Sequence, residues 1–141
     1  MKAFAYVNAA NEREALAGLD AQRGRVLPIA GGMGLVGLLK NYIAQPEHLV
    51  NDKNLDKTIA LQGGGARIGA AVTLTELIEH AGVAKAYPAL ITAAEEVGTP
   101  QIRNAGTVGG NIMQRPRCWY FRNEEFHCLK KGRGRCFAVD G

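Results

Sequence analysis

Two glycine-rich segments, Ala30–Leu35 (AGGMGL) and Thr107–Asn111 (TVGGN), have the composition of anion-binding loops. Glycines let main-chain amides approach a phosphate because no Cβ atom intervenes, and the start of a following helix offers unpaired N–H groups. Thr107 and Asn111 add polar side chains that can form hydrogen bonds. Two such loops in one small chain would suit a long ligand with two ends, although a pair of purely structural turns is the competing interpretation.

The three cysteines form a second candidate site. Cys118, Cys128 and Cys136 are spaced C-x9-C-x7-C, and His127 precedes the second of them. An odd number of cysteines cannot pair completely within the chain, which favours thiol or metal chemistry in a reducing compartment. Thiolates ligate both iron–sulfur clusters and zinc. All four ligands of a Cys3His zinc site are present in the chain. The spacing, however, lacks the close pairs of cysteines that are typical of zinc modules. Three unrelated free cysteines are the remaining alternative.

No side chain has the setting of a general acid, a general base or a nucleophile. The sequence contains no paired-carboxylate site, no Ser/His/Asp arrangement and no HExxH motif. His48 and His80 fall at the ends of expected elements, where we assign them to the surface. We therefore expect no catalytic residue in this chain.

Composition and charge limit the class of protein. The chain has 141 residues, of which 47% are hydrophobic and 21% charged, as in a globular protein of one domain's length. The absence of a long apolar run and of a signal peptide predicts no membrane span and a cytoplasmic location, or a periplasmic one only if a partner carries the chain across. The basic residues are unevenly distributed along the sequence, since seven of the 17 lie between Gln114 and Cys136.

The elements that must position these residues follow from periodicity and capping. Asn11 with Glu14, and Thr73 with Glu76, have the spacing of capping boxes and predict helix starts. Pro28 predicts a strand at the edge of a sheet, because proline cannot donate to a central ladder. Three glycines predict a hairpin. We expect strands over 2–7, 25–30, 48–50, 59–62 and 66–69, and helices from 11, over 35–43, from 73 and over 88–97.

This pattern predicts an α+β fold with an irregular tail. A boundary near 51–57 divides the chain into a first α+β part over 1–55, the start of a second over 56–113, and a basic cysteine-containing tail over 114–141. Trp119, Tyr120 and Phe121 are expected to pack the tail against the rest of the chain. Arg103 and Asn104 are expected to brace the second glycine segment.

Several motifs, taken in order, resemble one known family. They are AGGMGL at Ala30–Leu35, RIGAAVTLTEL at Arg67–Leu77 and GTPQIRNAGTVGGN at Gly98–Asn111. Together they resemble the FAD-binding subunit of the molybdenum hydroxylases, which include xanthine dehydrogenase, carbon monoxide dehydrogenase and the aldehyde oxidoreductases. QRPRCWYFR at Gln114–Arg122, followed by two further cysteines, resembles the subgroup whose flavin subunit carries a [4Fe–4S] loop, as in 4-hydroxybenzoyl-CoA reductase and a bacterial aldehyde oxidoreductase.

The resemblance implies a two-part FAD-binding fold of the vanillyl-alcohol oxidase and molybdopterin dehydrogenase type, with the second part truncated. It also implies that Cys118, Cys128 and Cys136 ligate the cluster, with zinc as the second choice of metal. The FAD-binding residues that it implies are Ile29, Ala30, Gly31, Gly32, Met33, Gly34, Leu35, Thr107, Val108, Gly109, Gly110 and Asn111.

The function implied is electron relay. The flavin subunit would pass electrons between the [2Fe–2S] clusters of a small partner subunit and an external acceptor, while a large subunit with the molybdenum cofactor oxidises the substrate. The chain departs from the family at Met33 and Gly34, which replace polar residues of the usual loop and predict FAD binding weaker by about 1–3 kcal/mol. A fourth cluster thiolate and the later flavin-contacting segments are also missing. We expect a fragment, a split subunit or a truncated product that associates with itself or with a partner.

Two other functions compete with this one. A zinc-stabilised basic module could bind nucleic acid through its cations and through Trp119, Tyr120 and Phe121. The glycine segments argue against that function because they would have no role in it. A degenerate scaffold that has lost the flavin but keeps its partner surface is the other alternative.

Overall fold

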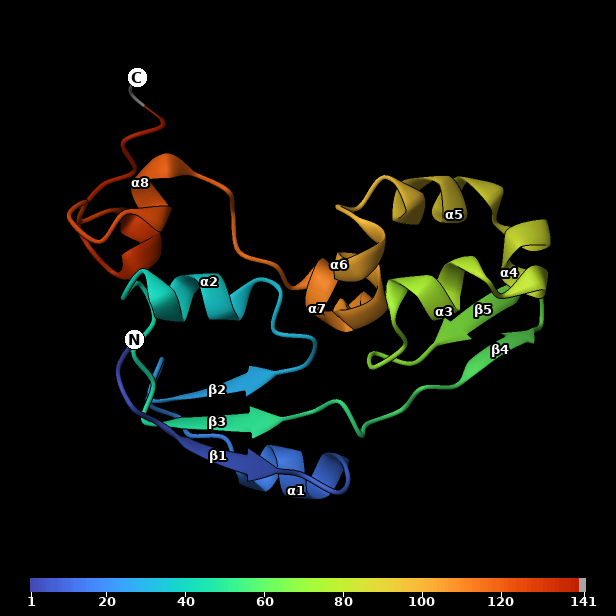
Figure 1. Cartoon of the computed structure of the whole chain (residues 1–141), viewed down its shortest axis with the longest axis horizontal. Helices are drawn as coiled ribbons and strands as arrows, with labels where there is room; N and C mark the ends of the chain where they lie inside the picture. The colour runs from blue at the N-terminus through green and yellow to red at the C-terminus, as the bar shows by residue number, and fades with distance from the viewer. Residues whose placement is uncertain (140–141) are drawn as a thin grey trace.

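The computed structural model describes residues 1–139 and confirms a fold of mixed α and β structure. The last two residues of the tail expected over 114–141 lie outside the described part. Figure 1 shows a parallel sheet with its helices, a hairpin covered by further helices, and the tail. No helix within residues 1–139 is both long and apolar enough to cross a membrane.

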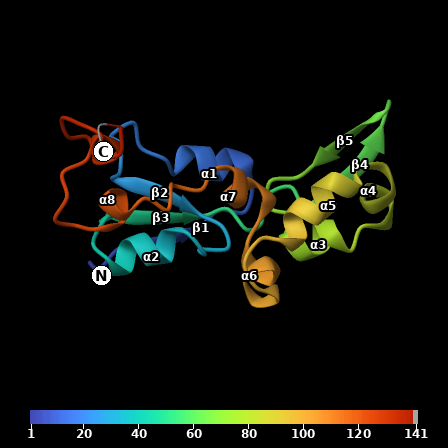
Figure 2. The ribbon, with the colours of Figure 1, turned by 90° about the horizontal axis from the view of Figure 1, so that it is seen from above.

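The first sheet is parallel and has the order β1-β3-β2, formed by β1 (Ala5–Asn8), β2 (Val26–Ile29) and β3 (His48–Asn51). The central strand β3 is buried over its last three residues. Pro28 lies on an edge strand, as expected, and pairs in register with Val50. Helix α1 (Glu12–Ala17) and helix α2 (Leu35–Lys40) lie on opposite faces of this sheet in both views (Figures 1 and 2).

The predicted helix caps form, one of them completely. The Thr73 hydroxyl accepts a hydrogen bond from the Glu76 amide at 3.1 Å, and the Glu76 carboxylate accepts one from the Thr73 amide at 2.7 Å, which completes a capping box. At α1 the Asn11 side chain accepts from the Glu14 amide, but the Glu14 carboxylate accepts from the amide of Ala10. Asn11 therefore caps the helix without the reciprocal bond that the capping box requires.

The predicted hairpin is confirmed as β4 (Ile59–Gln62) and β5 (Gly65–Ile68), whose turn contains two glycines with positive φ. It packs beside α3 (Leu74–Ile78), α4 (Ala81–Ala86) and α5 (Pro88–Glu95). Their shared core contains Val72, Leu77, Val83 and Ile91.

Helix α4 was not predicted from the sequence, because the side chain that caps its start is a histidine, His80. The His80 Nδ1 atom accepts a hydrogen bond from the Val83 amide at 3.1 Å. His80 is half-buried and acts as a helix cap, so its assignment as a plain surface residue is wrong.

Two further short helices, α6 (Pro100–Ala105) and α7 (Val108–Ile112), follow. We expected a glycine turn at 107–111, and that expectation is wrong. Thr107 caps α7. The helix was not predicted because α7 contains two glycines, and glycine has low helix propensity. Arg103 does not brace this segment; its guanidinium donates to the carbonyl oxygens of Glu95, Val97 and Gly98 at the end of α5.

The tail has little regular structure, as expected, apart from α8 (Trp119–Arg122) and the 3₁₀ turn η1 (Leu129–Lys131). It packs against α2 through a cluster that contains Leu38, Phe121 and Cys128. In both views it occupies one end of the molecule (Figures 1 and 2). Trp119 does not contribute to this packing, because it is 90% exposed, so its expected role is wrong.

Candidate functional site

The first glycine segment, far from the second in the sequence, lies in the structure against the residues just before the second. The loop from Ile29 to Leu35 leads from β2 into α2 and lies against the end of α6 (Figure 1). A Cβ atom on Gly31 would lie 1.8 Å from the carbonyl oxygen of Ala105 and 3.1 Å from the Cα atom of Gly106. The first loop therefore touches the chain immediately before Thr107, and only glycine fits at this crossing.

The first loop carries a row of unused amide donors. Within residues 1–139, the main-chain amides of residues 31–35 donate no hydrogen bond to a protein acceptor. The next amide along the chain, that of Val36, donates to the Gly32 carbonyl at 2.9 Å. Gly32 has a φ of +73°, which glycine adopts without strain. Consecutive free amides in a loop that reverses direction form a concave surface suited to an anion such as a diphosphate.

The second segment lacks this property, which corrects an expectation from the sequence. The amides of Val108 and Gly109 donate to the carbonyl oxygens of Val72 and Ala70, and the Gly110 amide donates to the Thr107 hydroxyl at 3.1 Å. The glycines allow α7 to pack closely on residues 70–72 instead. A Cβ atom on Gly109 would lie 2.9 Å from the Cβ of Ala70 and 3.0 Å from its oxygen. Thr107–Asn111 thus packs on residues 70–72, just beyond the residues that the first loop touches, and we call it the wall.

A buried acceptor lies beside the first loop. Asp52 follows β3, and its amide donates to the carbonyl of Ile29, two residues before Gly31, at 3.1 Å. Its Oδ1 atom is buried without a hydrogen-bond partner in the described structure. Burial raises the pKa of the Asp52 carboxyl above its usual value. This group could not be found from the sequence pattern, because a single Asp after a strand is unremarkable.

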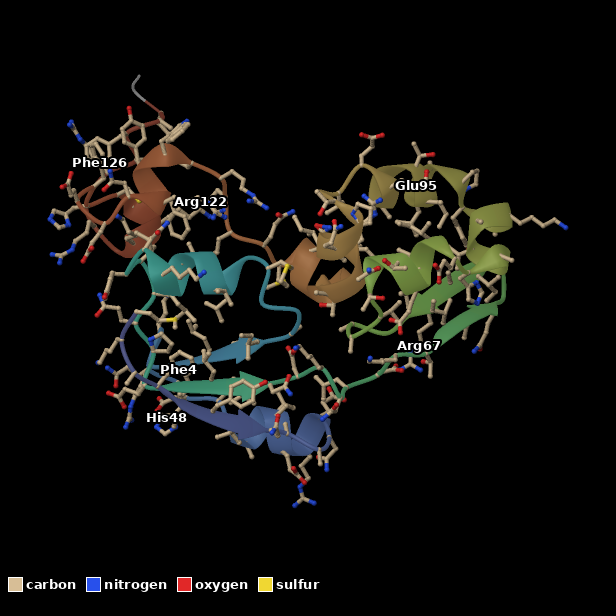
Figure 3. All side chains as sticks on the ribbon, viewed as in Figure 1. Phe4, His48, Arg67, Glu95, Arg122 and Phe126 are labelled. Carbon is tan, nitrogen blue, oxygen red and sulfur yellow. The ribbon has the colours of Figure 1, made fainter. Side chains whose placement is uncertain are left out.

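The three cysteines come together at one cavity. Cys118, Cys128 and Cys136 line a cavity of about 180 Å³ together with apolar side chains that include Phe121 and Phe137. Three aromatic rings support its wall, with centroid separations of 5.1 Å for Tyr120–Phe126 and 5.3 Å for Tyr120–Phe137. Figure 3 places Phe126 in the tail. The amide of Leu129 donates to the Arg135 carbonyl at 2.7 Å and closes the loop that carries these residues.

The arrangement of the thiols bears on which metal could fit. Within residues 1–139, no three His, Cys, Asp or Glu side chains converge closely enough to hold a single metal ion. His127 is exposed and is not part of the cavity wall. A mononuclear zinc ion draws its ligands to one point, whereas a four-iron cluster binds its thiolates at separate corners. The described residues therefore form no mononuclear site of the kind that zinc takes.

A comparison with protein families identifies the fold. Residues 2–118 match the family described as the FAD binding domain in molybdopterin dehydrogenase. The chain belongs to this family. It is 40% identical over 148 aligned residues to the aldehyde oxidoreductase FAD-binding subunit PaoB of Escherichia coli (strain K12), covering 100% of this chain and 45% of that protein. It is 37% identical over 86 residues to the carbon monoxide dehydrogenase medium chain of Hydrogenophaga pseudoflava, covering 60% of this chain and 30% of that one.

Solved structures agree with this family assignment. The fold is similar to that of reconstituted CO dehydrogenase from Oligotropha carboxidovorans, with a TM-score of 0.73 and 32% identity over 77% of this chain and 39% of that chain. It is also similar to quinoline 2-oxidoreductase from Pseudomonas putida 86, with a TM-score of 0.71 and 33% identity over 77% and 38% of the two chains. The FAD-domain chain thus spans less than half the length of these relatives.

Proposed function

We propose that this FAD-domain chain binds the diphosphate of FAD with the loop 29–35, against the wall formed by 107–111. The observation that carries the proposal is the row of free amides in residues 31–35, placed directly beside Gly106 by the Gly31–Ala105 contact. Main-chain amides hold a diphosphate without a cationic side chain, and the loop itself has none. The second segment supports this site through its shape, because its own amides are already used.

The proposed division of the chain follows this site. Residues 1–55 supply the parallel sheet and the amide loop, and residues 56–113 supply the hairpin, its helices and the wall. Together they would form the two parts of a flavin-binding fold of the vanillyl-alcohol oxidase type, with the second part incomplete. Residues 114–139, with the end of the tail, form the cysteine-containing extension.

The proposed role is electron transfer within a molybdenum hydroxylase. FAD, when bound, accepts electrons and passes them on one or two at a time. The relatives named above include an aldehyde oxidoreductase subunit and a carbon monoxide dehydrogenase medium chain. By analogy, a large subunit with a molybdenum cofactor would oxidise the substrate, and a small [2Fe–2S] subunit would connect it to this chain. This chain's own residues would bind and orient the flavin.

We further propose that the cysteine cavity holds a [4Fe–4S] cluster. Three thiols line one apolar cavity, and Lys130 at its wall would offset the negative charge of thiolates and cluster. The described chain offers three of the four thiolates that such a cluster takes. The fourth would come from another chain or segment.

Flavin binding can be tested directly. The 141-residue chain is titrated with FAD while the quenching of flavin fluorescence is followed. We expect saturable binding that Gly31→Ala weakens at least about tenfold, because the new methyl group separates the loop from its wall. Gly34→Ala is the matched control, since nothing lies within 4 Å of a Cβ atom there and its φ of −92° suits alanine. Flavin fluorescence that the chain does not quench at any concentration would instead support the degenerate scaffold.

The cluster has its own test. After anaerobic incubation with iron and sulfide, a broad absorbance band at about 400 nm is expected, as iron–sulfur thiolate clusters show. Cys128→Ser removes a buried ligand and should abolish the band, while His127→Ser should leave it intact. Stoichiometric zinc uptake without iron would refute the cluster.

A further inference from the structure

The main-chain hydrogen bonds of the tail bring two of the three cysteines side by side. Cys128 pairs with Arg135 in an isolated parallel bridge, and the amide of Leu129 donates to the Arg135 carbonyl at 2.7 Å. The carbonyl oxygen of Cys128 also accepts a hydrogen bond from the amide of Arg133 at 3.2 Å. Cys136 comes directly after Arg135 in the sequence. It is therefore the diagonal neighbour of Cys128 across this bridge.

The separation of these two positions suits a disulfide. Paired strands lie about 4.8 Å apart and a strand rises about 3.3 Å per residue, so diagonal Cα atoms are about 6 Å apart. Disulfides join Cα atoms that are about 4.4–6.8 Å apart, provided that the two side chains do not point away from each other. Cys128 and Cys136 both line the cysteine cavity, so their side chains face the same space. Both are free thiols in this structure.

Cys118 has no comparable main-chain link to either of them. It lines the same cavity but precedes α8, ten residues before Cys128. Within residues 1–139, no main-chain hydrogen bond joins residues 115–119 to residues 128–129 or 133–136. Cys118 is held near Cys128 by the side-chain packing of the tail, whereas Cys128 and Cys136 are held together by the backbone.

We infer that Cys128 and Cys136 form a reversible disulfide when the cavity holds no cluster. Cys136 is half-buried and Cys128 is only 5% exposed, so an oxidant from solution reaches Cys136 first. The oxidant is a small disulfide such as glutathione disulfide. The Cys136 thiolate attacks one of its sulfur atoms and expels one glutathione thiolate. The Cys128 thiolate then attacks the Cys136 sulfur of the mixed disulfide and expels the second glutathione.

The electrons and protons of this exchange balance. The two cysteines lose two electrons and two protons, and glutathione disulfide takes up both to become two molecules of glutathione. An excess of glutathione reverses the same two steps. The disulfide and the cluster exclude each other because both use the same two sulfur atoms, so the oxidised chain cannot hold the cluster until it is reduced. This consequence rests on the proposed cluster, whereas the disulfide itself does not.

The test identifies which cysteines become linked in the full chain. The reduced, cluster-free chain is equilibrated without air with glutathione disulfide, blocked with N-ethylmaleimide and digested with trypsin in the absence of reductant. Trypsin cleaves after Lys and Arg, so the three cysteines fall in separate peptides, residues 118–122, 123–130 and 136–141. We expect mass spectrometry to find 123–130 linked to 136–141, with N-ethylmaleimide on Cys118. Dithiothreitol should return all three cysteines to free thiols.

Substitutions of single cysteines provide matched controls. Cys118→Ser should form the same linked peptide at a rate within about twofold of the parent, while Cys136→Ser should lose it. Cys128→Ser should also lose it, and Cys136→Ser repeats that result at a less buried position. A linkage made mainly through Cys118, a chain that keeps three free thiols, or a chain that gains only glutathione adducts would overturn the inference.

The cluster is followed separately on the same samples. A chain first incubated with iron and sulfide should form the linked peptide at least about tenfold more slowly, because cluster-bound sulfur atoms are not free to attack the oxidant. A reduced chain that forms the disulfide but never gains the iron–sulfur absorbance band would contradict the cluster and support the disulfide. Equal rates of linkage in a chain that does show the band would overturn the mutual exclusion.

Discussion

Gly31 packs so closely on Ala105 that a Cβ atom on Gly31 would lie 1.8 Å from the Ala105 carbonyl oxygen. This contact joins the loop after β2 to the end of α6 and thereby places the loop close to the start of α7. Gly34, three residues later in the same loop, has nothing within 4 Å of its Cβ position. The two glycines look equivalent in the sequence but have different structural roles.

The stability of the flavin-free chain should separate these two glycines. Gly31→Ala forces the two backbones apart and is expected to lower the free energy of unfolding by about 1–3 kcal/mol. Gly34→Ala should leave it unchanged or raise it slightly, because alanine restricts the unfolded chain. Urea unfolding followed by circular dichroism measures both. Equal loss in the two variants would show that the crossing at Ala105 is not specific.

Asp52 should make the chain less stable as the pH rises. Its pKa is raised in the folded chain by burial, so the folded state binds the proton more tightly than the unfolded state does. Stability linked to this group is therefore complete below its ordinary pKa of 3.8 and is lost as the pH rises through the raised value. Asp52→Asn should melt at a higher temperature than the parent at pH 7, and the difference should vanish near pH 3. A variant that is less stable at pH 7 would show that the carboxylate has a partner.

The stability that the capping box of α3 contributes should depend on pH with a sign opposite to that of Asp52. Hydrogen bonds from the Thr73 amide and hydroxyl lower the pKa of Glu76 below its ordinary value of 4.5. Its stabilising effect is therefore complete above pH 4.5 and is lost as the pH falls through the lower folded value. Glu76→Gln should be less stable than the parent at pH 7 and equal to it at pH 2. Thr73→Ala should cost about 1 kcal/mol at pH 7, the usual effect of losing an N-cap.

Two aromatic residues of α8, separated by one position, should differ sharply in their effect on stability when each is truncated. Phe121 is 6% exposed and joins the tail to Leu38 of α2, so Phe121→Ala should lower the free energy of unfolding by about 3 kcal/mol or more. Trp119→Ala removes an exposed ring and should change it by less than about 0.5 kcal/mol. Thermal melts monitored by circular dichroism give both values. A large loss in Trp119→Ala would mean that the indole packs against the chain.

Much of the fold was predictable because its signals are local. Pro28 indicated an edge strand, the glycines at 63–65 indicated a hairpin, and Thr73 with Glu76 indicated a helix start. Each of these depends on residues within a few positions of one another. Helices α4 and α7 were missed because a His cap and two glycines are weak signals for a helix.

By itself the sequence determined the glycine segments, the thiol spacing, the excess of basic residues in the tail and the family. Only the tertiary structure decided which amides are free. Residues 31–35 and 108–110 have similar glycine-rich composition, yet only the former keep their donors open, because the latter donate to residues 70–72 and to Thr107. It likewise decided that Phe121 faces inward while Trp119 faces outward. Hydrogen bonds and burial depend on segments distant in the sequence, which local pattern cannot specify.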